Sequence, residues 1–126
     1  MPKKILIVED EANILELLRL YLEREGYTVL EAENGVEGIK KWKSDKPDML
    51  LLDVMMPVMN GYEATKMIRS LDREDAKKIP IIAMTANAFT EDRIRAKEAG
   101  MNEHVAKPVD VELLMKVIYS GSAMKH

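Results

Sequence analysis

Short apolar runs alternate along the chain with longer stretches in which apolar residues recur every three or four positions. The runs are rich in Ile, Leu and Val, which favours β-strands. They predict five strands, at residues 4–8, 28–32, 49–53, 79–85 and 103–106. Most of these runs are apolar throughout, which is typical of parallel strands that are covered on both faces.

The stretches between the runs have the period of an amphipathic helix. Their recurring apolar positions are Ile14, Leu17, Leu18 and Tyr21, then Val36, Ile39 and Trp42, then Ala64, Met67, Ile68 and Leu71, then Ile94 to Ala99, and finally Leu113, Leu114, Val117 and Ile118. Five strands alternating with five helices predict an α/β fold, a doubly wound five-stranded parallel sheet. Because no repeat or linker interrupts the pattern, we expect residues 1–126 to form a single domain.

Composition narrows the function classes. The 126 residues include 19 basic and 22 acidic side chains, and a net charge of −3 argues against binding to nucleic acid or to an anionic membrane. The lack of cysteine excludes disulfides, thiolate metal sites and cysteine nucleophiles. The apolar run near the N-terminus is too short for a signal peptide or a membrane span. We therefore expect a cytoplasmic protein.

Polar residues follow four of the predicted strands. In doubly wound folds, ligands bind outside the carboxyl ends of the strands, so these residues are expected to meet at one edge of the sheet. Each has an ordinary alternative when taken alone, such as a helix N-cap for Asp10 or a solvated surface position for Lys107. Together they form a candidate site, which consists of Glu9, Asp10, Asp53, Thr85 and Lys107.

Three clustered carboxylates repel one another unless a cation neutralises them. With no cysteine and only two histidines, the available ligands are oxygens, and such a site suits Mg²⁺. A carboxylate beside Mg²⁺ and a lysine can attack phosphorus and form an acyl phosphate. The metal and Lys107 would neutralise the phosphoryl oxygens. This chemistry predicts that Asp53, at the end of the "MLLLD" run, becomes phosphorylated.

The segments "VED", "LLDVMMPVMNGYE", "MTANAF" and "AKP" occur in this order, and the chain resembles, over essentially its whole length, the receiver domain of two-component response regulators. The resemblance implies a flavodoxin-like (βα)5 fold with strand order 2-1-3-4-5. It also implies that Asp53 is the phosphoacceptor. Asp10 would ligate Mg²⁺ directly and Glu9 through water, with the backbone carbonyl of Met55 completing the metal site.

The resemblance assigns further roles to residues near the site. Lys107 would bind a phosphoryl oxygen and precede a cis bond to Pro108, and Thr85 would be the switch hydroxyl. Residues 55 and 87, which are Met55 and Asn87 here, would govern hydrolysis of the phosphoryl group. The face made by the fourth helix, fifth strand and fifth helix would bind a downstream protein partner.

One position departs from the commonest family pattern. A Tyr or Phe often stands three residues before the lysine, whereas this chain has His104. The run "AGMNEHVAKP" is similar to receivers of hybrid sensor kinases and their single-domain relatives, which often have histidine there. Two interpretations stay open: the imidazole moves with the switch, or it points into solvent.

The resemblance implies a signalling switch that a histidine kinase or a histidine phosphotransfer protein phosphorylates. It implies no enzyme activity beyond the protein's own phosphoryl transfer and autodephosphorylation. One alternative is a phosphatase of the haloacid dehalogenase type, but such enzymes need a second aspartate where this chain has Met55. Another is a pseudo-receiver that binds partners without phosphorylation, and the intact set of site residues argues against it.

Overall fold

The sheet has five parallel strands in the order β2-β1-β3-β4-β5, which confirms the predicted strand order. The computed structural model describes residues 3–56, 59–85 and 90–123. Its strands are β1 (Lys4–Val8), β2 (Thr28–Ala32), β3 (Met49–Asp53), β4 (Ile81–Thr85) and β5 (Glu103–Ala106). Since the strands are parallel, all five carboxyl ends lie at the same edge of the sheet.

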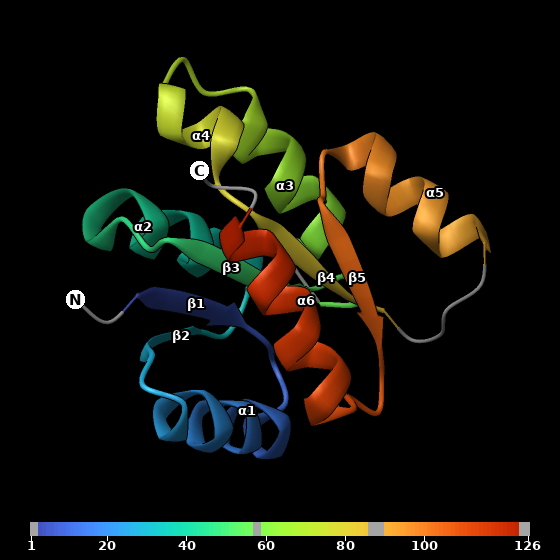
Figure 1. Cartoon of the computed structure of the whole chain (residues 1–126). Coiled ribbons are helices and arrows are strands. Elements are labelled where there is room, and N and C mark those ends of the chain that lie inside the picture. Colours follow the sequence, from blue (N-terminus) through green and yellow to red (C-terminus); the bar gives the residue numbers. More distant parts are fainter. Residues whose placement is uncertain (1–2, 57–58, 86–89, 124–126) are drawn as a thin grey trace.

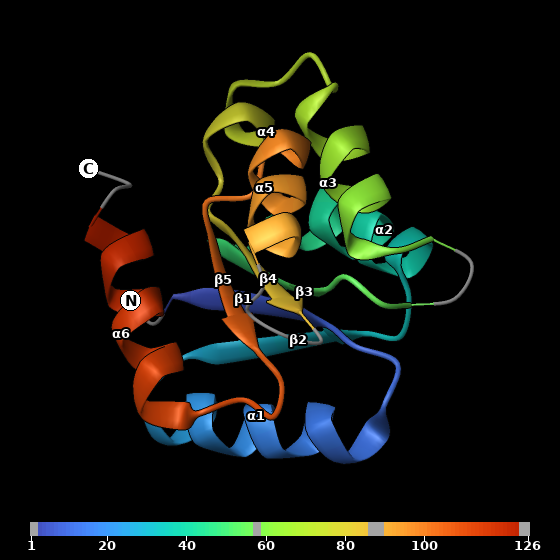
Figure 2. The ribbon, with the colours of Figure 1, turned by 90° about the vertical axis from the view of Figure 1, so that its right-hand side faces the viewer.

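Helices cover both faces of the sheet (Figures 1 and 2). One face is covered by α1 (Ala12–Arg24) and α6 (Val111–Ala123). The other is covered by α2 (Gly35–Asp45), α3 (Gly61–Arg69), α4 (Glu74–Lys78) and α5 (Thr90–Ala99). None of the helices in the described part of the chain combines the length and the apolar character that a membrane span requires.

The strands alternate their side chains between two hydrophobic clusters, one on each face. The α1/α6 cluster consists of Ile5, Ile7, Leu18, Leu22, Met49, Leu51, Ile82, Met84, Val105, Leu114 and Ile118. The α2–α5 cluster consists of Leu6, Val8, Ala32, Ile39, Trp42, Leu50, Leu52, Val54, Met56, Tyr62, Ala64, Ile68, Ala76, Ile79, Ile81, Ala83, Ala96, Ala99 and Met101. Each buried Leu or Ile contributes about 1.5–3 kcal/mol, so burial on both faces fixes the sheet.

The buried stripes of three helices are narrower than the sequence pattern predicts. Leu18, Ile68 and Leu114 are buried as expected, but the preceding residue in each case is about half exposed: Leu17, Met67 and Leu113. A helix turns by about 100° per residue, so a helix lying on a sheet buries mainly one row of residues spaced four apart. The residue just before each buried one then lies at the border of the contact.

The structure contains one short helix that the sequence pattern does not predict. This helix, α4, spans only five residues, too few for a period of 3.6 to be recognised. It also shortens the predicted strand 79–85, because Ile79 is the C-cap residue of α4 and β4 begins at Ile81. Pro80 has no N–H to donate to the neighbouring strands, and a central strand is therefore expected to start after it.

The segment "NGYE" positions α3 directly against the end of β3. Asn60 and Glu63 form a capping box, in which the Asn60 side chain accepts from the Glu63 N–H at 2.9 Å. A Cβ atom on Gly61 would lie 2.6 Å from the Asp53 carbonyl oxygen and 3.0 Å from the Val54 Cα. Only glycine allows the two backbones to approach this closely.

Replacing Gly61 by alanine should destabilise the protein by about 1–3 kcal/mol, because the added methyl group meets backbone atoms that cannot rotate away. Urea unfolding of Gly61→Ala measures this free energy. The exposed Lys66→Ala, on the same helix, should change stability by less than about 0.5 kcal/mol. Equal stability of Gly61→Ala and the wild type would show that the close approach does not constrain the fold.

Candidate functional site

Backbone hydrogen bonds carry the sheet one residue past the ends of β1 and β5. The Glu9 N–H donates to the Ala32 carbonyl at 3.0 Å, and the Lys107 N–H donates to the Thr85 carbonyl at 2.8 Å. Both residues therefore keep a defined direction although they lie outside the strands. This brings their side chains to the same edge as Asp53, which is the last residue of β3.

Each carboxylate oxygen of Asp53 accepts one hydrogen bond. The Met55 N–H donates to Oδ1 at 2.9 Å, and Lys107 Nζ donates to Oδ2 at 2.9 Å. Asp53 is almost completely buried, and an unpaired buried carboxylate costs several kcal/mol. The neighbouring loop and the lysine therefore hold this carboxylate in place.

Lys107 contacts a second buried carboxylate as well. Its Nζ lies 2.7 Å from Glu9 Oε1, while Glu9 Oε2 accepts from the Glu11 N–H at 3.2 Å. The Glu9 side chain has no exposed surface, whereas part of the Lys107 side chain is accessible. A single ammonium group thus bridges two carboxylates that come from different strands.

This arrangement shifts two pKa values. Burial, followed by the neighbouring Asp53, raises the pKa of Glu9 from its ordinary value of 4.5 to about 7, although the bond from Lys107 opposes the shift. For Lys107, burial acts to lower the pKa, but hydrogen bonds to Glu9 and Asp53 outweigh it and raise the pKa above its ordinary value. Lys107 therefore stays protonated at neutral pH, whereas the Glu9 carboxyl group titrates near pH 7.

Asp10 completes an acidic cluster. Glu9, Asp10 and Asp53 each offer a carboxylate oxygen, and these oxygens lie within 4.8 Å of one another. Asp10 is exposed, and the N-cap residue of α1 is Glu11, so Asp10 is not the N-cap of that helix. When ionised, three carboxylates around one ammonium leave negative charge uncompensated on an open side. Such an oxygen-only donor set fits Mg²⁺.

Thr85 lies at the same edge of the sheet, next to β5. Its side chain is fully buried, and its Oγ1 donates to the Val105 carbonyl at 3.5 Å. In the sheet register, Asp53 pairs with Met84, the residue before Thr85. The threonine thus links the strand beside Asp53 to the strand that leads to Lys107.

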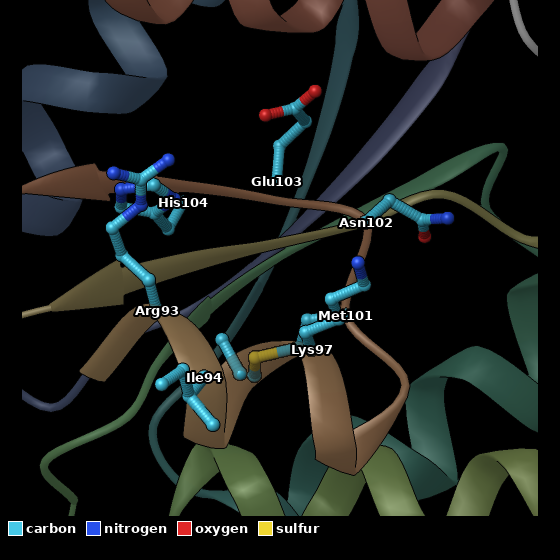
Figure 3. A pocket seen from close by; sticks show the side chains of 8 residues that line it. Arg93, Ile94, Lys97, Met101, Asn102, Glu103 and His104 are labelled. Carbon is cyan, nitrogen blue, oxygen red and sulfur yellow. The ribbon is translucent and has the colours of Figure 1, made fainter. Parts of the chain in front are cut away.

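His104 lies apart from the acidic cluster, on the α5 side of β5. Strand alternation explains this position, because the next residue, Val105, packs into the α1/α6 cluster on the opposite face. The half-buried His104 lines a cavity of about 560 Å³ between α5 and β5, together with Arg93 and Lys97 (Figure 3). Its part in a switch stays a prediction.

Three further positions complete the comparison with the sequence analysis. The Met55 side chain is 69% exposed, and the Lys107–Pro108 peptide bond is cis. Asn87 lies outside the described residues. The sequence analysis did not include Asn60, whose N-x-x-E spacing to Glu63 was the available signal.

These features define a class of protein: a doubly wound α/β fold with an acidic cluster, whose oxygens could hold a cation, at the carboxyl edge of its sheet. Residues 5–119 match the family described as "Response regulator receiver domain". The chain belongs to this family. It is a receiver domain of two-component signalling, rather than an enzyme that turns over a separate substrate.

Individual relatives agree with the family. The polar-differentiation response regulator DivK of Brucella anthropi is 34% identical, with 98% of this chain and 100% of DivK covered. The transcriptional regulatory protein ResD of Bacillus subtilis is 46% identical over 83% of this chain, which spans only 42% of the length of ResD. The receiver domain of the sensor histidine kinase PA1611 of Pseudomonas aeruginosa, solved with a magnesium ion in its active-site cleft, has a TM-score of 0.85 and 33% identity, with 95% and 97% covered.

The raised pKa of Glu9 predicts a pH dependence of stability. Between the unfolded value of 4.5 and the folded value of about 7, the native state binds more protons than the unfolded state, so stability falls as pH rises through this window. Glu9→Gln cannot ionise and should lack this loss, which is at most about 3 kcal/mol. Urea unfolding at several pH values without divalent cations measures it. Parallel curves for the two proteins would contradict the prediction.

Proposed function

We propose that this chain, as one receiver domain over residues 1–126, accepts a phosphoryl group onto Asp53 from a phosphohistidine of a partner protein. The observation that carries this proposal is the environment of the Asp53 carboxylate. It is held at the strand end by Met55 and Lys107 and lies within 4.8 Å of oxygens from Glu9 and Asp10.

In the transfer step, an Asp53 oxygen forms a bond to phosphorus while the P–N bond of the phosphohistidine breaks. The electron pair of that bond stays on the imidazole nitrogen of the partner. Lys107 Nζ lies 2.9 Å from Asp53 Oδ2, which places its ammonium group beside the incoming phosphoryl oxygens. Positioning and charge neutralisation are the main requirements of such a transfer.

The acidic cluster supports Mg²⁺ as the cofactor of this step. Asp10 and Asp53 would bind the ion directly, Glu9 would bind it through water, and the backbone carbonyl of Met55 would complete the set. Bound Mg²⁺ would neutralise the negative charge of the phosphoryl oxygens that the single ammonium group of Lys107 leaves uncompensated. The magnesium ion in the related receiver domain of PA1611 supports this assignment.

The proposed phosphoryl donors are a histidine kinase or a histidine phosphotransfer protein, because receivers occur in such systems. One relative with a matching region is hybrid signal transduction histidine kinase I of Dictyostelium discoideum, which is 34% identical over 94% of this chain. The proposal also keeps the cytoplasmic location expected from the sequence and includes no direct contact with nucleic acid or membrane.

The downstream protein partner would bind the face made by α5, β5 and α6. These are the fourth helix, fifth strand and fifth helix that the sequence predicts, because α4 is the additional short helix. Thr85 reaches this face through its bond to β5, and His104 lines the cavity there. The phosphoryl group would form charge-assisted bonds with Thr85 and Lys107, each worth roughly 1.5–3 kcal/mol. Shifting a population from 1:99 to 99:1 needs about 5.5 kcal/mol, so partner binding is expected to complete the change.

Asp53 should be the phosphoacceptor. Incubation of the wild type with Mg²⁺ and acetyl phosphate should add one phosphate, as intact-protein mass spectrometry can measure. Asp53→Asn should remain unlabelled, because the amide lacks the nucleophilic carboxylate. Asp72→Asn, which changes an exposed acidic residue, should be labelled like the wild type. Equal labelling of Asp53→Asn would contradict the proposed function.

Met55 and Asn87 should set the lifetime of the phosphorylated state. The thioether of Met55 is at best a weak hydrogen-bond acceptor, and its bulk can block the attacking water. Met55→Asn should therefore speed the loss of phosphate, and Asn87→Ala should slow it, each by about 5–30-fold. Decay rates of the phosphorylated protein in Mg²⁺ buffer measure this. An unchanged or longer lifetime for Met55→Asn would show that residue 55 does not control the water.

A further inference from the structure

Met55 carries an oxidisable sulfur, and its backbone lies beside the buried carboxylate of the site. Its backbone N–H donates to Asp53 Oδ1 at 2.9 Å, so the residue is fixed to the carboxylate. Its side chain is 69% exposed, and among the described residues it belongs to neither the α1/α6 cluster nor the α2–α5 cluster. The thioether is thus open to small oxidants and carries little of the packing that stabilises the fold.

The other methionines in the described part of the chain do not share this combination. Met67 is 49% exposed, but it lies near the end of α3, whereas it is Gly61, at the start of this helix, that approaches Asp53. Several others are less than one-tenth exposed, namely Met49, Met56, Met84 and Met101. Because access controls oxidation of methionine, Met55 should react ahead of these residues.

We propose that Met55 is a reversible oxidation site whose sulfoxide shortens the lifetime of the phosphoryl group on Asp53. The oxidant is a hydroperoxide. A lone pair of the sulfur attacks the terminal peroxide oxygen and forms the S–O bond while the O–O bond breaks. The proton of the transferred oxygen moves to the departing oxygen, which leaves as water when the oxidant is hydrogen peroxide. The sulfur loses two electrons and the peroxide gains them. A methionine sulfoxide reductase reverses the step, as two thiols become a disulfide and the oxygen leaves as water.

In the proposed function, residue 55 controls the water that attacks the phosphorus. The thioether is a weak acceptor, whereas the sulfoxide carries a polar S–O bond whose oxygen accepts hydrogen bonds strongly. At residue 55 this oxygen can hold and orient a water that the thioether excludes. The inference rests on the proposed function, because it requires the acyl phosphate on Asp53.

The first experiment tests the selectivity of oxidation. The protein is treated with dilute hydrogen peroxide, and peptide mass spectrometry follows sulfoxide formation at each methionine. Met55 should be oxidised faster than Met67 and well before Met84, while the circular dichroism spectrum stays unchanged. Oxidation of Met67 or Met84 at the same rate as Met55, or earlier, would overturn the proposal.

The second experiment tests the effect on phosphate loss. After removal of peroxide, wild type, Met55→Leu and Met67→Leu are phosphorylated with acetyl phosphate and Mg²⁺, and their decay is followed. Peroxide treatment should shorten the half-life of the wild type and of Met67→Leu by about 5–30-fold. It should leave the half-life of Met55→Leu unchanged, since leucine keeps the bulk but has no sulfur. Treatment with a methionine sulfoxide reductase should restore the wild-type half-life.

The outcomes separate this inference from the proposed function. Failure of the untreated wild type to accept phosphate would contradict the proposed function itself. Normal phosphorylation with a half-life that Met55 oxidation does not change would overturn only the present inference. A peroxide effect that persists in Met55→Leu would overturn it too, because another residue would then be responsible.

Discussion

The site depends on one ammonium group that compensates two buried carboxylates. Asp53 and Glu9 have almost no exposed surface, and Lys107 lies within 3 Å of an oxygen of each. Without this lysine, two buried carboxylates would face each other with no positive charge between them, at a cost of several kcal/mol. Burial, together with Asp53, raises the pKa of Glu9 in spite of the bond from Lys107, so the lysine compensates the two carboxylates only in part. The remaining negative charge favours the binding of a further cation. Phosphoryl transfer requires such a cation beside the carboxylate.

The parallel sheet brings these charged side chains together. Glu9 follows β1, Asp53 ends β3 and Lys107 follows β5, so the three side chains come from distant parts of the sequence. Strand register and the hydrogen bonds that extend the sheet past β1 and β5 bring them to one edge. The close approach of Gly61 packs the start of α3 against the end of β3, and the Met55 N–H bonds the second oxygen of the Asp53 carboxylate. Burial of the apolar clusters on both faces supplies the free energy that offsets the cost of these buried charges.

The same geometry connects the charged edge to the surface beside β5, where the proposed downstream partner would bind. Thr85 bonds to the backbone of β5, and Lys107 is the residue that directly follows this strand. His104, on that strand, lines the cavity beside α5. A new charge on Asp53 would draw on Thr85 and Lys107 together, and both belong to this connection. The Met55 N–H bonds the other oxygen of this carboxylate, so the proposed signalling contact and the proposed control of hydrolysis would use different neighbours of one aspartate.

The sequence by itself determined the five strands, the strand-end residues and the class of chemistry, because strand patterning and residue type are local properties. It also contained the resemblance that implied the strand order. Tertiary structure decided which apolar residues are buried, since Leu17 and Leu113 fit the helical period yet lie at the border of the sheet contact. It decided that α4 forms, because a five-residue helix depends on packing, as at the buried Ala76, rather than on periodicity. It also decided the pKa of Glu9 and the position of His104, because burial and charge proximity exist only once distant strands are side by side.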